Sequence, residues 1–559
     1  MSRSIRRTTG LEGRSVCDYH SEGLFNQTLL AVDVNPGEPP VEDLVAAGTV
    51  TRPIDPFLRK IITLASHLAN AEDRALDGPR FWEEMAEALR DDSELPQLLT
   101  DGVKAGVLRL TSTTELSNLS LFAVYNRNFV GTARAISFLR LLGLYAFAER
   151  RAADGEKYYL DSDSVAGGFA VSTSHRDRFV NVADRYLSFV EWSDAGGAGA
   201  NVDVRGLIED GTGMSFEDYV RCVAVLHAHF DPADVRVNGV PALERQGIDP
   251  ASPLLKWLDD HSYLPEEIDA LLGDDPFTKL RDTGHFLALQ RPFVRLGERY
   301  YLLNPRALDN ALGLGVFYAA MDANVARAGQ SDKAKNDAAK TFGAVAGRFY
   351  EQYAGTLVGR IADRGGSYFH PEVRDDENKL SSDFFVLEDD RLVFFEMRHG
   401  RVARETIESL SPDAINAAFE MLYAKLQQLG RNLRKFADGR LVIPGISAAD
   451  VSRLYPVVCL LPRSPAIQRK MDADVAARGW LPDRIGRYSV APFEIVEAES
   501  LEGLDGLQTR IRFSDLIDEK TAEPLSRFTF FKNYLTVTKG LRPQMDHDLQ
   551  RKQDKGLIT

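Results

Sequence analysis

Two carboxylates, Asp383 and Glu396, stand on either side of a short polar turn in the segment SSDFFVLEDDRLVFFEMRHGRV. Apolar runs flank that turn, a pattern typical of a β-hairpin. With the turn centred between Asp389 and Asp390, the register places Asp383 directly opposite Glu396. Like charges in that position destabilise a hairpin unless a cation neutralises them, and carboxylate oxygens are preferred ligands of Mg²⁺. The pattern therefore indicates a divalent-metal site.

Arg398 follows Glu396 at the interval that returns a strand side chain to the same face of a sheet. Asp383, Glu396 and the cation at 398 would then converge on one spot. The neighbouring residues of both runs are apolar, so charged side chains there need a specific reason to be present. The alternative is a polar hairpin edge, in which Glu396 only pairs with Arg398 or Arg401.

Asp383, a spacer and the triplet Glu396–Arg398 resemble the D…(D/E)xK core of the PD-(D/E)XK nuclease superfamily. The stretch GRFYEQY, which carries Glu351, resembles the helix that often precedes this core with a further acidic residue. The stretch AKLQQLGRN, which carries Gln428, resembles the following helix, where a glutamine and basic residues often contact DNA. The resemblance covers roughly residues 335–440, about a fifth of the chain.

The resemblance implies an α/β domain with a restriction-endonuclease-like mixed sheet flanked by helices. It also implies phosphodiester hydrolysis, with Mg²⁺ (or Mn²⁺) held by Asp383 and Glu396. Glu351 and Arg398 are the other catalytic candidates. The expected partner is nucleic acid, DNA rather than RNA. Fusions of this kind are associated with restriction and antiphage defence at the level of the family.

Position 398 departs from the family pattern, because arginine stands where the superfamily has lysine. Arginine keeps its proton at any physiological pH, so it can stabilise charge and orient a phosphate but is a poor proton acceptor. We expect Arg398 to take the lysine's role, and Lys379 offers a displaced ammonium. The alternative is a catalytically inactive nuclease-like module that binds nucleic acid or a partner protein.

The helix after the core carries a polar row, in which Gln428, Arg431 and Lys435 recur on one face. Together with Arg401 they are candidates for contacting nucleic acid. Residues 391–440 contain nine basic and six acidic side chains, so this segment is positive in an acidic chain. An ordinary solvated helix face is the alternative for this row, and a solvated glutamate is the alternative for Glu351.

The sequence predicts a mainly helical region over 1–275, a strand–helix connector over 276–330 and a nuclease-like α/β domain over 331–559. The helical region could comprise two subdomains that serve recognition or regulation, bind a partner protein or form a homo-oligomer. Three short strands are predicted around the connector, at 286–289, 293–296 and 300–303.

Composition restricts the class of protein. The 559 residues are 44% hydrophobic and carry a formal net charge of −15, which argues against a histone-like nucleic-acid coat. Three distant cysteines, Cys17, Cys222 and Cys459, form neither a disulfide framework nor a zinc pattern, so a cytoplasmic location is expected. The basic start lacks the apolar run of a signal peptide, and no segment is long and apolar enough to predict a membrane span.

Overall fold

The structure is a computed structural model, and the residues that it describes are 54, 58, 61, 113–128, 179–197, 202–230, 242–303, 308, 311, 314–398, 412–460, 474–507 and 510–522. The chain forms two compact units. The first contains residues 1–161 and 218–314, and the second contains residues 162–217 and 315–559. The predicted connector is divided between them, and a domain boundary near residue 275 stays a prediction. No helix in the described ranges has the length and apolar character needed to cross a bilayer.

The first unit combines helices with a small sheet. Its elements are α6 (Thr113–Tyr125), η1 (Asn126–Asn128), most of α11 (Phe216–Phe230), β1 (Ala242–Glu244), α13 (Pro253–Asp260), β2 (Ser262–Tyr263), α14 (Pro265–Leu272), α15 (Pro276–Gln290), β3 (Phe293–Leu296) and β4 (Arg299–Leu302). The strand order is β1-β4-β3-β2. Two of the predicted strands are confirmed as β3 and β4, but the strand predicted at 286–289 is wrong. Those residues end α15, which starts with Pro276 behind an Asp275 side-chain cap.

The second unit is built on a seven-stranded mixed sheet. Its strands are β5 (Tyr368–Pro371), β6 (Phe384–Glu388), β7 (Arg391–Arg398), β8 (Arg453–Leu460), β9 (Arg484–Ile485), β10 (Tyr488–Val490) and β11 (Glu494–Glu497). The main order is β5-β6-β7-β8-β10-β9, and β11 also pairs with β8. Strands β5, β6 and β7 are antiparallel neighbours, whereas β7 and β8 run parallel. The α/β class expected for this part of the chain is therefore confirmed.

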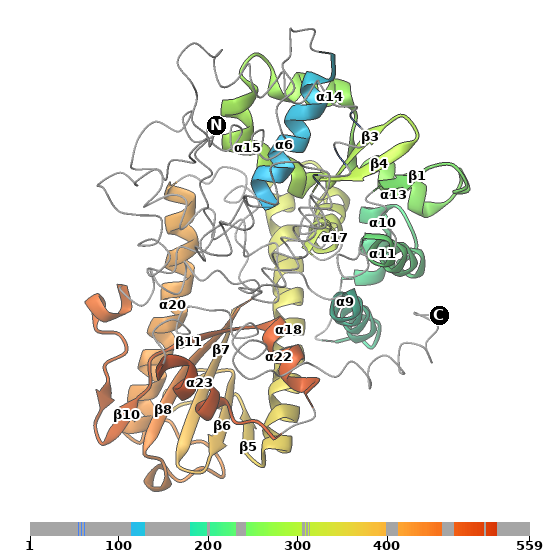
Figure 1. The fold of residues 1–559 in the computed structure, drawn as a ribbon. Coiled ribbons are helices and arrows are strands. Elements are labelled where there is room, and N and C mark those ends of the chain that lie inside the picture. The colour runs from blue at the N-terminus through green and yellow to red at the C-terminus, as the bar shows by residue number, and fades with distance from the viewer. Residues whose placement is uncertain are drawn as a thin grey trace, which may run out of the picture. The chain divides into compact units, whose positions relative to one another are not determined.

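Helices cover both faces of this sheet (Figure 1). The long α20 (Pro412–Ala437) packs on one face against Leu392 and Phe394 of β7. The other face packs Val393 and Phe395 against α18 (Asp332–Gly365), α22 (Ala498–Asp505) and α23 (Phe513–Ala522). Even-numbered β7 side chains thus face α20, as the two-residue period of a strand requires.

Three further helices complete the second unit: α9 (Phe179–Asp194), α10 (Val204–Thr212) and most of α17 (Leu314–Arg327). The ring of Phe189 on α9 stacks on Phe349 of α18, with their centroids 4.7 Å apart. Arg185 of α9 forms a buried ion pair with Glu502 of α22, its guanidinium nitrogen 2.8 Å from the carboxylate oxygen. A segment far from the sheet strands in sequence therefore belongs to their unit.

Candidate functional site

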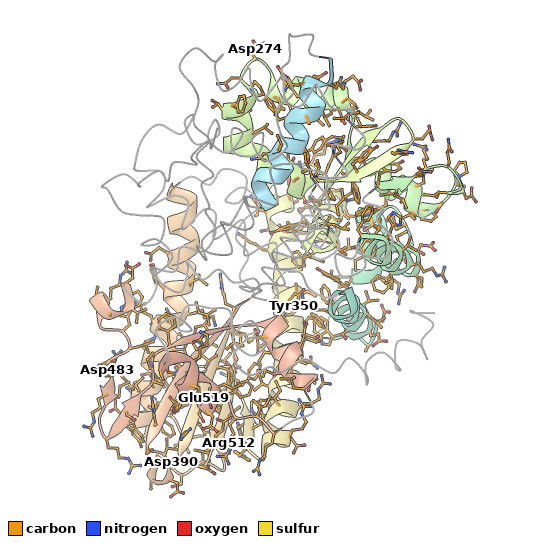
Figure 2. All side chains as sticks on the ribbon, in the orientation of Figure 1. Asp274, Tyr350, Asp390, Asp483, Arg512 and Glu519 are labelled. Carbon is orange, nitrogen blue, oxygen red and sulfur yellow. The ribbon has the colours of Figure 1, made fainter. Side chains whose placement is uncertain are left out.

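The β6–β7 hairpin brings the two predicted carboxylates together. Phe384 pairs with Phe395, as the predicted turn centre requires, and the Asp383 amide donates to the Phe395 carbonyl at 3.0 Å, so Asp383 lies just beyond the last pair, at the end of β7 that carries Glu396. The predicted register is confirmed. Both residues lie at the open end of the hairpin, away from the turn that Asp390 marks in Figure 2. Asp383 is 8% exposed and Glu396 is fully buried, so neither is an ordinary surface carboxylate.

Two side chains of α20 hold the Glu396 carboxylate. The Lys425 ammonium donates to Oε2 at 2.9 Å, and the Asn432 amide donates to Oε1 at 3.2 Å. The same Asn432 amide lies 3.1 Å from the Ser382 hydroxyl, which ties the helix to the residue before Asp383. The Asp383 carboxylate accepts the Met397 amide hydrogen at 2.5 Å. Both carboxylates are therefore fixed in position by hydrogen bonds.

The ionised carboxylates of Asp383 and Glu396 carry two negative charges, and the Lys425 ammonium neutralises one of them. Burial, followed by the charge of Asp383, raises the pKa of Glu396 to about 8, while Lys425 opposes the rise. Burial also raises the pKa of Asp383. Burial works against the charge of Lys425, but the charges of Glu396 and Asp383 raise its pKa overall. A further cation at this place would lower the energy of both ionised carboxylates.

Two more carboxylates belong to the same electrostatic cluster. Glu351 is half-buried on α18, one residue after the Tyr350 that Figure 2 labels, and burial and the charge of Asp383 raise its pKa. Glu372 follows β5, and burial, Asp383 and Glu351 raise its pKa to about 7. Glu351, Glu372, Asp383 and Glu396 are called the strand-end cluster below.

The strand-end cluster is rich in oxygen ligands but is not a closed metal cage. Among the residues that the structure describes, no group of three or more His, Cys, Asp or Glu side chains is arranged to hold a metal ion. Mg²⁺ is commonly bound through only one or two carboxylates, with water and substrate phosphate supplying the remaining oxygens. Asp383 and Glu396 fit that open mode, because both are buried, fixed and incompletely neutralised.

The cation beside Glu396 is Lys425, which sequence reasoning did not select. Arg398 is half-buried on the same face of β7, and its charge lowers the pKa of Lys425, so it lies in the same electrostatic environment. Lys379, the other candidate, instead pairs with Glu377 at 2.6 Å on an exposed loop. The signal that could have found Lys425 is its spacing from Gln428 and Asn432, which places all three on one helix face.

The predicted nucleic-acid contacts are dispersed. The Gln428 amide lies at the site, 3.4 Å from the Ser381 carbonyl, and Arg431 is exposed on α20. The Lys435 ammonium is held by Asp375 at 2.6 Å, so it is already paired within the protein. Arg401 lies outside the described residues.

Comparisons of the chain with protein-family models, with curated proteins and with solved structures found no match. The geometry of the strand-end cluster, rather than kinship, therefore carries the functional argument.

Proposed function

We propose that this protein is a metal-dependent nuclease that hydrolyses phosphodiester bonds, with DNA as its expected substrate. One observation carries the proposal: Asp383 and Glu396 are both buried at the open end of a central hairpin, with the Lys425 ammonium 2.9 Å from Glu396. Two carboxylates and an ammonium are the groups that a D…(D/E)xK nuclease site needs.

The order of elements around the site supports the same proposal. Helix α18 is followed by three antiparallel strands, β5 to β7, then by α20 and by β8 parallel to β7. We propose that this is the restriction-endonuclease-like core that the sequence resemblance implies. In such a core the helix after the carboxylate strand packs beside the site, as α20 does here.

In this proposal Asp383 and Glu396 hold Mg²⁺ or Mn²⁺. A bound ion would lower the pKa of an attacking water and stabilise charge on the phosphate. Asn432 holds Glu396 in a fixed orientation, and the Met397 amide does the same for Asp383. Lys425 takes the role of the family lysine, since its ammonium lies where it can orient the nucleophile and offset negative charge.

A second candidate function is a non-catalytic module that binds nucleic acid. The observation that favours it is the direct ion pair between Lys425 and Glu396, which satisfies the carboxylate from within the protein. A buried carboxylate that already has an ammonium partner needs a cation less than an unpaired one does. Under this function nucleic acid would bind without being cleaved.

A cleavage assay separates the two candidates. Supercoiled plasmid, linear duplex, single-stranded DNA and RNA are incubated with Mg²⁺ or Mn²⁺ and wild type, Glu396→Gln or the matched control Glu377→Gln. We expect Glu396→Gln to lose at least 1,000-fold in rate, on the order of the loss when a metal ligand is removed. Glu377→Gln should cleave like wild type, because Glu377 pairs with Lys379 and Arg440 on a surface loop.

Two results would overturn the nuclease proposal. Cleavage that persists in Glu396→Gln would place the activity elsewhere or in a contaminant. Nucleic-acid binding without cleavage in either metal would support the non-catalytic module. Thermal unfolding supplies a readout that does not depend on turnover: Mn²⁺ should raise the Tm of wild type and of Glu377→Gln, but not of Glu396→Gln.

A further inference from the structure

A pocket of about 260 Å³ opens beside the strand-end cluster, within the second unit. It is lined by Trp192 of α9, Arg348, Glu351 and Gln352 of α18, and Phe384 of β6. Glu351 belongs both to this pocket and to the cluster, and Phe384 directly follows Asp383 in the chain. Glu351 is therefore the residue through which a ligand in the pocket would reach the strand-end cluster, at the end of β6 that follows Asp383.

Trp192 forms a fixed aromatic wall. Its indole N–H donates to the Gln352 side-chain oxygen at 2.7 Å, and its ring packs against Phe349 with centroids 5.7 Å apart. Gly197 lies so close that a Cβ there would be 2.5 Å from the indole, so only glycine leaves room for the ring. The side chain is half-buried, which leaves part of the ring accessible. A rigid, partly exposed aromatic ring is what a nucleobase stacks on.

Arg348 supplies the positive charge of the pocket. Its side chain is exposed on α18, and among the described residues it has no ion-pair partner. Arg348, Glu351 and Gln352 are spaced so that they share one helix face. An unpaired guanidinium binds phosphate in a bidentate manner, through two parallel hydrogen bonds. The Gln352 amide group adds a polar donor at the same wall.

We propose that this pocket is a nucleotide subsite, which binds the nucleotide next to the scissile phosphate. The base stacks on Trp192 and the adjoining phosphate pairs with Arg348. The proposal rests on the nuclease function proposed above and identifies a part of the substrate path. It assigns a role in substrate binding to α9, a helix more than 150 residues before β6 in the sequence.

Binding without turnover tests the subsite. Fluorescence anisotropy of labelled 20-nucleotide single-stranded and duplex DNA is measured in EDTA across a salt series. We expect Arg348→Ala to weaken binding by about 5–10-fold and to reduce the salt slope by about one. Lys340→Ala is the matched control, because Lys340 is exposed on the same helix but does not line the pocket. It should change affinity by less than about twofold.

Trp192 variants test the stacking half of the proposal. Trp192→Leu should weaken binding by roughly 5–20-fold with an unchanged salt slope, whereas Trp192→Phe, which keeps an aromatic ring, should lose less than about threefold. Circular dichroism checks folding of both, and the exposed Arg348 variants decide the question if Trp192→Leu unfolds. Affinity that is unchanged in both Arg348→Ala and Trp192→Leu would overturn the subsite.

The outcomes separate the subsite from the nuclease. Metal-dependent cleavage with wild-type affinity in Arg348→Glu overturns the subsite and leaves the nuclease standing. Weaker binding in Arg348→Ala, in a wild type that never cleaves, supports the subsite and assigns it to the non-catalytic module. A wild type that binds no DNA under any salt condition overturns both.

Discussion

Two acidic clusters lie near one another in the sequence, yet their carboxylates behave in opposite ways. The loop cluster consists of Asp375, Asp376 and Glu377. Every member has a cation: Lys435 pairs with Asp375 at 2.6 Å, and Arg440 contacts Asp376 at 2.8 Å and Glu377 at 2.5 Å. Hydrogen bonds from Lys435 and Lys379 respectively lower the pKa of Asp375 and of Glu377 to about 2.

The strand-end cluster has four carboxylates, and Lys425 is the cation that its members share. Burial is the largest cause of each raised pKa. The number of carboxylates therefore does not identify a cation site. What identifies it is burial combined with too little positive charge from the protein itself.

Among the variants that compare the two clusters, the largest difference is expected between removal of Lys425 and removal of Lys435. Lys425→Met should lower the metal-dependent cleavage rate by about 100–1,000-fold, as loss of one preorganised charge at a reacting group does. Lys435→Met removes the same charge from the same helix but only frees Asp375, so its rate should stay within about threefold of wild type. Equal losses in both variants would contradict the distinction between the clusters.

Stability against pH should also separate the clusters, with opposite signs. The pKa of Glu396 is raised in the folded state, so without metal its ionisation opposes folding as pH rises from about 4.5 to about 8. Since one pKa unit corresponds to about 1.4 kcal/mol, we expect Glu396→Gln to raise the free energy of unfolding by roughly 1–3 kcal/mol at pH 9. The gain should shrink toward pH 5.

Glu377→Gln should change stability with pH in the opposite direction. The folded-state pKa of Glu377 is lowered, so its ion pairs stabilise the protein above about pH 4.5 and lose that effect as pH falls toward 2. This variant should be less stable than wild type at pH 7, and the difference should shrink below about pH 4.5 and vanish as pH falls toward 2. Urea unfolding in EDTA measures both variants. Curves with the same sign would show that the two clusters do not differ in charge balance.

The hairpin of the candidate site could be predicted because it depends on local rules. A turn centre and a two-residue period suffice to bring Asp383 to the Glu396 end of the hairpin and to put Arg398 on the same face of β7 as Glu396. The error at 286–289 has a local cause too: a short apolar run fits both a strand and a helix end, and the Asp275 cap with Pro276 selects the helix.

The remaining parts of the site depend on long-range packing. The predicted row on α20 was Gln428, Arg431 and Lys435, but the row that meets the hairpin is Lys425, Gln428 and Asn432. Helical spacing defines several rows of side chains along α20, and only the packing of α20 on the sheet decides which row contacts the hairpin. The same applies to Trp192, whose approach to α18 leaves no periodic signal in either segment.

The smallest expected effect is at position 398, where the sequence departs from the nuclease pattern. Because Lys425 already places an ammonium 2.9 Å from Glu396, restoring the family residue with Arg398→Lys should change the cleavage rate by less than about threefold. Combining Arg398→Lys with Lys425→Met sharpens the test. If Lys425 holds the role, the double variant should stay as slow as Lys425→Met alone; recovery of more than about tenfold would return that role to position 398.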